Sequence, residues 1–254
     1  MPVAEVRVSV AVSTAVFGVR PDPHGVPRLC VALVPRMREP FLDRWALPGA
    51  WLGADEELAD VAARVAAECV PGPVRRLEQL AAFGAVDRSP TGRVLTVAHW
   101  ALSPALDDDG AAPASSPDPD VAGLPIGVHV RWHRADAPPA LAFDHAQILA
   151  AAVARLRADL PRAGVGHALL GPSFTLAELR AVHEAVLGRG LDAANFRRAT
   201  LAAGTLEETG EVRGGTPHRP PKLYRYRPAG PGSDPSHRAG RPPLTHQPRP
   251  RSHP

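Results

Sequence analysis

Cysteine and long apolar runs are scarce in this chain, and each scarcity excludes a class of protein. Only Cys30 and Cys69 are cysteines among the 254 residues; the two could pair, but nothing in the sequence suggests a disulfide framework. No apolar run approaches the roughly 20 residues that a membrane-spanning helix requires. Residues 1–19 alternate Val and Ala with polar side chains and contain Arg7, which is a strand pattern rather than a signal peptide. We therefore expect a cytoplasmic protein without membrane contact.

Lysine is nearly absent as well, and positive charge is unevenly placed. Lys222 is the only lysine, and the richness in Ala, Arg, Pro and Gly is typical of a high-GC genome, so the arginine count alone carries little weight. Residues 1–168 hold 16 Arg against 19 Asp and Glu, a net charge of −3, whereas residues 169–228 and 229–254 each reach +3. A basic end on an acidic body indicates an anionic partner for that end, nucleic acid first.

Strand and helix patterns occupy the first part of the chain. Apolar and alternating segments predict β-strands over 4–19, 28–35 and 93–103. Residues 56–69 repeat apolar side chains at helical spacing, which predicts an amphipathic helix packed on a sheet. A longer helix is predicted over 141–160, with Asp144 as its N-cap. These elements indicate an α+β domain.

Composition sets the domain boundaries. Residues 107–127 are dense in Asp, Pro, Gly and Ser, so we expect disorder there within a first domain that spans 1–162. A second domain follows over 163–228. The Pro-, Arg- and His-rich tail over 229–254 has no apolar periodicity, and we expect it to be disordered.

Capping signals organise the second domain. Thr175 is followed three residues later by Glu178, which is the spacing of a capping box, and Gly188 closes the helix so begun. Asp192 caps the next helix. Residues 205–228 read as strand, glycine-rich turn and strand. Helix, turn, helix and hairpin, in this order, predict a winged helix-turn-helix, a DNA-binding arrangement.

A known motif is present in altered form within the first domain. The stretch "WALPGAWLGADEELADVAARVAAEC" over 45–69 resembles the Nudix box, G-x5-E-x7-R-E-U-x-E-E-x-G-U. The upstream "LPG", together with Glu56 and Arg64 eight residues apart, fixes the register. In that register the first Gly of the box falls on Ala50 and the closing Gly on Pro71.

The altered positions are those that bind metal. The three helix carboxylates of the box fall on Val65, Glu68 and Cys69. Carboxylates at i, i+3 and i+4 share one helical face and can bind a hard cation such as magnesium. Val65 has no ligating atom, and a thiol suits magnesium poorly. We therefore expect no catalytic residue, no bound metal and no cofactor, with Glu56 and Arg64 acting either as ligand contacts or as a surface ion pair.

The resemblance to Nudix proteins implies an α/β/α sandwich with a mixed sheet that binds a nucleoside diphosphate linked to another group. Arginines suit the phosphates, and aromatic or apolar side chains suit the base. The candidate base platforms are Phe17, Trp45, Trp51 and Phe83, with the hydrophobic core as the alternative location. Arg88 and Arg93 are candidate phosphate partners, with a solvated loop position as the alternative. The candidate ligand contacts are Arg36, Trp45, Trp51, Glu56, Arg64, Glu68, Arg88 and Arg93.

The C-terminal stretches narrow the resemblance. "LAFDHAQIL" (141–149), "FTLAELRAVHEAVLGRGLDAANFRRATL" (174–201) and "RGGTPHRPPKLYRYRP" (213–228), together with the altered box, are similar to NrtR-type Nudix-related transcriptional regulators. This resemblance implies a repressor of NAD-related or sugar-nucleotide-related genes that binds a double-stranded operator as a homodimer. It also implies ADP-ribose or a related nucleotide as effector.

Base-reading and phosphate-binding residue types lie where a winged helix needs them. The predicted second helix carries polar side chains that can read guanine and adenine, and the hairpin carries cations for phosphates. Phe196 is expected to face the core and fix the helix. The candidate DNA contacts are Asn195, Arg197, Arg198, Arg213, His218, Arg219 and Lys222.

Three alternatives remain open from the sequence. The first is a Nudix hydrolase of ADP-ribose or another nucleoside diphosphate derivative; the second is a nucleotide-binding adaptor without DNA affinity. The third treats the C-terminal region as a helical dimerisation domain with solvated arginines. Thr91 also departs from the family pattern, because an Arg is expected in this loop.

Overall fold

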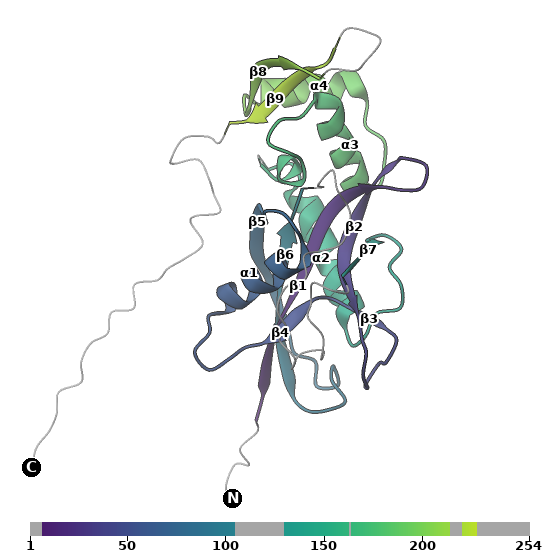
Figure 1. Ribbon diagram of the computed structural model, residues 1–254, viewed down its shortest axis with the longest axis vertical. Helices are drawn as coiled ribbons and strands as arrows, with labels where there is room; N and C mark the ends of the chain where they lie inside the picture. Colours follow the sequence, from purple (N-terminus) through teal and green to yellow (C-terminus); the bar gives the residue numbers. More distant parts are fainter. Residues whose placement is uncertain (1–6, 105–129, 163, 214–219, 228–254) are drawn as a thin grey trace, which may run out of the picture.

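A mixed β-sheet organises the first two thirds of the protein. The computed structural model describes residues 7–104, 130–162, 164–213 and 220–227 (Figure 1). The sheet has the order β3-β2-β1-β6-β5, while β4 pairs with β1 and β7 with β2. β1 and β6 are parallel, and the other pairs are antiparallel. The strands are β1 Ser9–Pro21, β2 Pro27–Pro35, β3 Trp45–Ala46, β4 Gly49–Trp51, β5 Arg76–Phe83, β6 Val94–Leu102 and β7 Arg131–Arg134.

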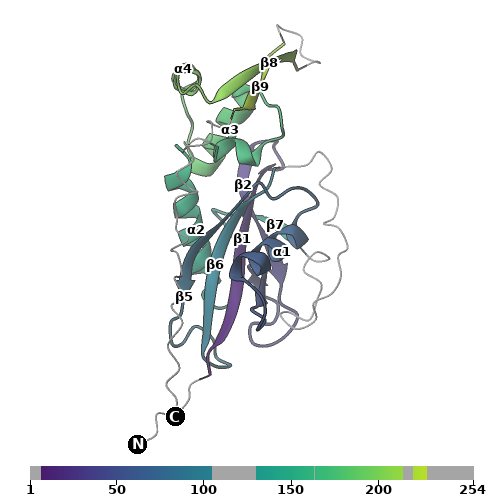
Figure 2. The same cartoon turned by 90° about the vertical axis from the view of Figure 1, so that its left-hand side faces the viewer.

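Two helices cover the opposite faces of this sheet, as Figure 2 shows. α1 (Leu58–Cys69) turns Val61, Ala62 and Val65 towards the strands, where they are buried. α2 (His145–Asp159) packs an apolar stripe into the largest core cluster, which centres on β1, β2 and β6. The α+β sandwich with a mixed sheet is therefore confirmed.

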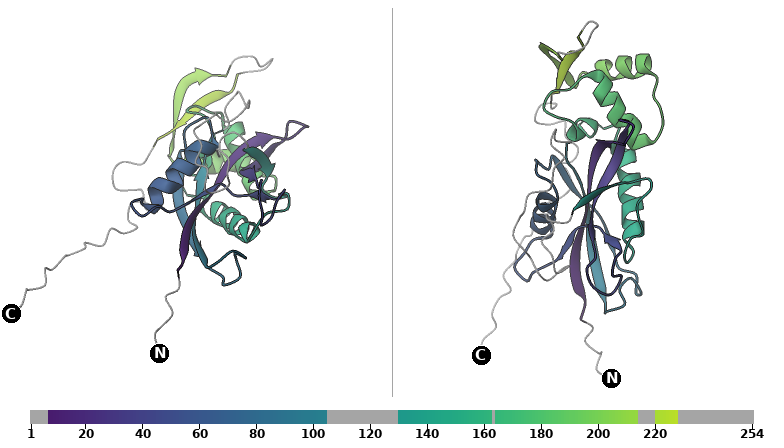
Figure 3. Two further views of the ribbon diagram at one scale, coloured as in Figure 1. Left: turned by 60° about the horizontal axis from the view of Figure 1, so that its bottom comes forward. Right: turned by 45° about the vertical axis from the view of Figure 1, so that its right-hand side comes forward.

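A smaller unit follows α2. It contains the 3₁₀ helix η2 (Gly166–Leu169), α3 (Leu176–Leu187), α4 (Ala193–Ala202), β8 (Leu206–Val212) and β9 (Lys222–Tyr226). Phe174 and Tyr224 exchange two backbone hydrogen bonds of 2.9 and 2.8 Å, so the segment before α3 is tied to the hairpin. Figure 3 shows α4 at the end of the molecule away from the sheet. The order helix, turn, helix and hairpin agrees with the prediction.

Local capping signals are confirmed at α3 and α4. Thr175 and Glu178 form both bonds of the capping box, and Gly188 takes the left-handed conformation at the C-cap with φ +70°. Asp192 accepts from the backbone N–H of Asn195 at 2.8 Å. None of the helices in the described part of the chain combines the length and apolarity that crossing a bilayer demands.

The predicted capping of α2 by the Asp144 side chain is not found. Asp144 stands directly before α2, but its side chain makes no capping hydrogen bond. Its carboxylate instead accepts two hydrogen bonds from Arg88, at 2.8 and 2.7 Å, because that cation, 56 positions away in the sequence, is adjacent in the fold. The expected disorder over 107–127 and 229–254 lies outside the described residues. Strands β3, β4, β5 and β7 were not predicted.

Gly49 offers a test of the strand arrangement. A Cβ at this position would lie 2.6 Å from the carbonyl oxygen of Val12 on β1, which is closer than packed atoms approach. Gly49→Ala is therefore expected to cost about 1–3 kcal/mol, measured by urea-induced unfolding. Gly190→Ala is the matched control, since its Cβ would meet nothing within 4 Å, and it should change stability by less than about 0.5 kcal/mol. Equal effects at both positions would contradict the strand packing.

Candidate functional site

A cavity of about 350 Å³ opens beside β1, β4 and β6. Its walls come from these strands, from the loop over 36–40 that follows β2, from residues 88–91, and from the segment that enters α2. Segments far apart in the sequence therefore meet around one space.

Positive charge dominates the lining. Arg36, Arg38, Arg64 and Arg88 contribute to it, and Glu39 is the one carboxylate among the described lining residues. Burial, reinforced by neighbouring Arg38, lowers the pKa of Arg36. An anion in the cavity would relieve that cost, because it favours the charged form of each guanidinium. The cavity is chemically suited to phosphate or carboxylate groups.

The arginines are already held in place by the protein. Arg88 is only 9% exposed and is clamped by Asp144. Arg36 donates through Nε to the carbonyl oxygen of Pro40 at 2.8 Å, and its guanidinium lies 4.7 Å from the ring centre of Phe143. Little side-chain entropy remains to be lost on binding, so the site is preorganised.

Aromatic and hydroxyl groups complete the cavity. Trp51 lines it and keeps 42% of its surface exposed, which leaves a face available for stacking. Phe143 lines the other wall. Ser13 and Thr96 share a 3.0 Å hydrogen bond and belong to the lining. A ligand with an aromatic ring, hydroxyls and anionic groups matches these surfaces.

The predicted ligand contacts divide into two groups. The structure brings together Arg36, Trp51, Arg64 and Arg88 at the cavity. It does not place Trp45, Glu56, Glu68 or Arg93 in the lining.

The four residues outside the lining have structural partners. Trp45 packs on the main core and on the ring of His133, with centroids 4.3 Å apart. Arg93 donates to the carbonyl oxygens of Gly84 and Ala85 at 2.8 and 2.9 Å, which holds the loop after β5. Both side chains are thus engaged within the protein, outside the described cavity lining.

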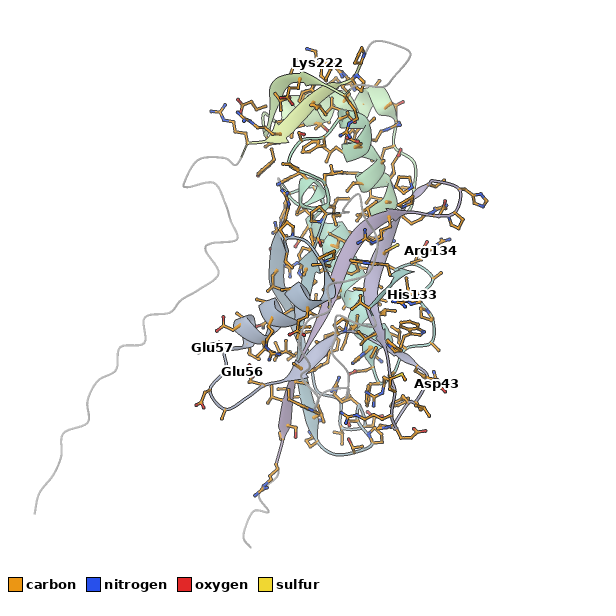
Figure 4. All side chains as sticks on the ribbon, in the orientation of Figure 1. Asp43, Glu56, Glu57, His133, Arg134 and Lys222 are labelled. Carbon is orange, nitrogen blue, oxygen red and sulfur yellow. The ribbon has the colours of Figure 1, made fainter. Side chains whose placement is uncertain are left out.

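The remaining two residues, Glu56 and Glu68, pair with Arg64. Arg64 donates to Glu56 at 3.0 Å and lies 4.0 Å from Glu68. Glu56 also accepts from the backbone N–H of Gly53, and this bond, followed by that from Arg64, lowers the pKa of its carboxyl. Figure 4 shows Glu56 on the loop that precedes α1. The candidate platforms Phe17 and Phe83 belong to the core, with Phe17 fully buried.

The altered box positions have become part of the core. Val65 and Cys69 are fully buried on the face of α1 that packs against the sheet, and the Cys69 thiol donates to the Val65 carbonyl at 3.0 Å. Burial, with Glu68 nearby, raises the pKa of that thiol. Within the described residues, no three His, Cys, Asp or Glu side chains are arranged as a metal site. The donor set does not fit magnesium, because Glu68 is the only carboxylate of the three box positions.

Several lining residues escaped the sequence prediction. Arg38, Phe143 and His145 belong to the cavity, as do the Ser13 and Thr96 hydroxyls. His145 lies in the "LAFDHAQIL" stretch, where Asp144 was interpreted only as a helix cap. The Ser13–Thr96 pair joins residues 83 positions apart, so no local sequence pattern predicts it.

The predicted DNA contacts lie on the second unit, away from the cavity. Asn195, Arg197 and Arg198 are exposed on α4, none of whose ten residues is buried. Arg198 donates to the side-chain oxygen of Asn195 at 2.6 Å. Phe196 packs against the small core of Phe174, Leu179 and Tyr224, as predicted.

The hairpin cations form exposed ion pairs. Arg213 pairs with Glu178 at 3.0 Å, and Lys222 with Glu208 at 2.8 Å. Figure 4 places Lys222 at the opposite end of the molecule from Glu56. Exposed pairs of this kind contribute about 1 kcal/mol or less, so phosphates can replace the carboxylates at small cost. His218 and Arg219 lie outside the described residues.

Most of the chain is similar to known proteins. The family model of the NrtR DNA-binding winged helix domain matches residues 166–226. The ADPR-responsive transcriptional repressor NtrR of Acinetobacter baylyi is 31% identical over 203 residues, which are 78% of this chain and 76% of the relative. The crystal structure of Shewanella oneidensis NrtR is 31% identical with a TM-score of 0.67, covering 86% of this chain and 94% of that chain. Its complex with a 27mer DNA gives a TM-score of 0.67 at 30% identity, with the same coverage of 86% and 94%.

The burial of His145 predicts a loss of stability in acid. Burial is the main cause that lowers its pKa from 6.5 to about 4; Arg88 and Arg36 add to the effect, and Asp144 opposes it. Because the unfolded state then binds the proton first, this contribution is complete above pH 6.5 and falls as the pH drops towards 4, by about 3 kcal/mol in all. Urea unfolding across this range measures the slope. His145→Asn should flatten the slope, and an unchanged slope would contradict the buried neutral ring.

Proposed function

The chain belongs to the NrtR-type Nudix-related transcriptional regulators, and we propose that it represses transcription from an operator to which its affinity responds to ADP-ribose or a related nucleotide. The observation that carries this proposal is one chain with an arginine-lined cavity at one end and a winged helix at the other. The Acinetobacter relative is named as responsive to ADPR, and the Shewanella relative was crystallised with DNA. The regulated genes are proposed to be NAD-related or sugar-nucleotide-related.

The DNA-binding part of the proposal rests on residues 163–228. α4 would enter the major groove, where Arg197 and Arg198 can contact guanine and Asn195 can read adenine. Arg213 and Lys222 would bind phosphates from the hairpin. We propose a homodimer on a palindromic operator, because two-fold protein symmetry then matches two half-sites.

The sensing part of the proposal rests on residues 1–162. The Arg36 and Arg88 guanidiniums would face the pyrophosphate of the ligand, and Trp51 would stack on its base. We infer that the nucleotide stays intact, because Val65 and Cys69 replace two of the three carboxylates that would hold magnesium. A sensor needs no cofactor under this proposal.

A continuous route joins cavity and winged helix. α2 starts at the cavity with His145 and runs about 22 Å over 15 residues. Near its far end Arg157 donates through Nε to the carbonyl oxygen of Val186, in the last turn of α3, at 2.9 Å. Val182 and Val186 of α3 are buried in the same core cluster as residues of α2. We propose that ligand binding shifts α2 against α3 and so reorients the winged helix.

A mobility shift with simultaneous nucleotide analysis tests the function. The protein is mixed with DNA from upstream of its own gene, with and without ADP-ribose and magnesium, and the nucleotide is then analysed for cleavage. We expect a shift that ADP-ribose alters while the nucleotide remains intact. Arg197→Gln and Arg198→Gln should weaken the shift at least about tenfold, whereas Arg7→Gln removes the same charge at the opposite end and should not. Cleavage in magnesium without any DNA shift would support the hydrolase instead.

Arg157 provides a separate test of the route between the two ends. Wild type is expected to show a change of about 5- to 150-fold in operator affinity when ADP-ribose saturates it. Arg157→Gln should bring this ratio close to one while leaving each separate affinity nearly unchanged, because the residue lines neither site. Arg155→Gln is the matched control, since Arg155 pairs with Asp159 and Glu78 within the first unit. A normal ratio in Arg157→Gln would rule out this contact as the coupling.

A further inference from the structure

We propose that His145 is a ligand contact of the cavity, where its Nε2–H donates to a phosphate oxygen of the bound nucleoside diphosphate. The inference rests on the proposed function and adds a specificity-determining residue to it. Three observations carry it: the bond to Nδ1, the availability of Nε2 on a buried ring that lines the cavity, and the surrounding charges.

The first observation fixes the tautomer. The backbone N–H of Leu47 donates to His145 Nδ1 at 3.0 Å, a bond that joins residues 98 positions apart. A nitrogen that accepts a hydrogen bond carries no proton, and a neutral imidazole has one proton, so it resides on Nε2. The protein backbone therefore sets His145 as a donor at its other nitrogen.

The second observation concerns Nε2 of His145 and the cavity. His145 is 8% exposed and lines the cavity. Its Nε2 is not among the fully buried side-chain atoms without a partner in the described residues, whereas Nε2 of His133 is. Nδ1 is engaged by Leu47, so Nε2 is the ring nitrogen left for a ligand in the cavity that His145 lines.

The third observation is electrostatic. Arg88 and Arg36 lie close enough to disfavour a second proton on the ring, and Asp144, which would favour it, is engaged by Arg88. Together with burial, these cations keep the ring neutral near pH 7, with a pKa of about 4. The oxygen that Nε2–H meets beside two guanidiniums is therefore an anionic one, and a phosphate oxygen is the acceptor that suits all three groups.

The hydrogen bond from His145 would let the cavity discriminate between ligands. A buried donor left without an acceptor carries the desolvation cost of that group, so a ligand lacking an oxygen at this point binds poorly. His145 is also the first residue of α2, so the same hydrogen bond would connect ligand and helix directly.

Two substitutions separate the two nitrogens. His145→Asn keeps an acceptor near the Leu47 N–H and leaves no donor at the Nε2 position, whereas His145→Gln places an amide donor near the Nε2 position and loses the acceptor for Leu47. ADP-ribose affinity is measured by calorimetry, and folding by urea unfolding near neutral pH. We expect His145→Asn to fold normally, to bind operator like wild type without ligand, and to bind ADP-ribose about tenfold or more weakly. His145→Gln should lose stability and less of its affinity.

His133→Asn is the matched control, because that ring makes a T-shaped contact with Trp45 outside the cavity lining, and the variant's ADP-ribose affinity should equal that of wild type. Wild-type affinity in a folded His145→Asn variant would overturn the proposal. Should the variants fold poorly, ¹⁵N NMR of the wild-type ring decides: ADP-ribose should shift protonated Nε2, and an unchanged signal would overturn it. Failure of wild type itself to bind ADP-ribose would refute the proposed effector as well, so the two failures are distinguishable.

Discussion

The buried ion pair between Arg88 and Asp144 is the constraint on which the site depends. Its two hydrogen bonds, 2.8 and 2.7 Å long, connect the loop before β6 to the residue that precedes α2. The adjacent bonds from Ala142 N–H to the Trp45 carbonyl and from Leu47 N–H to His145 secure the same junction. Breaking one partner of a buried pair costs about 3–5 kcal/mol, because the other charge stays buried alone. The direction of α2, and with it the cavity wall, follows from this pair.

Around this neutral pair, the described lining of the cavity carries a net positive charge. Asp144 pairs with Arg88, and the described lining holds Arg36, Arg38 and Arg64 besides, with Glu39 as its one carboxylate. Holding cations in place without full compensation costs stability, and a bound anion recovers that cost in the form of affinity. A site built in this way favours a ligand with several negative oxygens over a neutral one, whatever the group attached to them.

The sequence predicts what is local and misses what is distant. The Thr175–Glu178 capping box, the Gly188 C-cap and the buried face of α1 depend on residues within one or two turns, and all are found. Asp144 has the same local capping signal, yet its carboxylate accepts hydrogen bonds from Arg88, 56 positions away in the sequence. Short strands such as β3, with two residues, leave no periodicity to detect. The cavity is built from such distant contacts. The sequence therefore indicates Arg88 as a ligand contact but not its pairing with Asp144, and it does not indicate that Trp45 packs against the core.

The altered box positions show two competing uses for one helix face, metal binding and core packing. Val65 and Cys69 are fully buried between α1 and the sheet, and the thiol of one bonds to the carbonyl of the other. Carboxylates at these positions would have to leave the apolar core or carry the cost of a buried charge. A sensor gains from the exchange. A protein that cleaved its effector would erase the signal it reports, and regulation requires only that the ligand bind two states with different affinity. Val65 and Cys69 thus serve the packing of α1 on the sheet, while the arginines around the cavity supply positive charge for an anionic ligand.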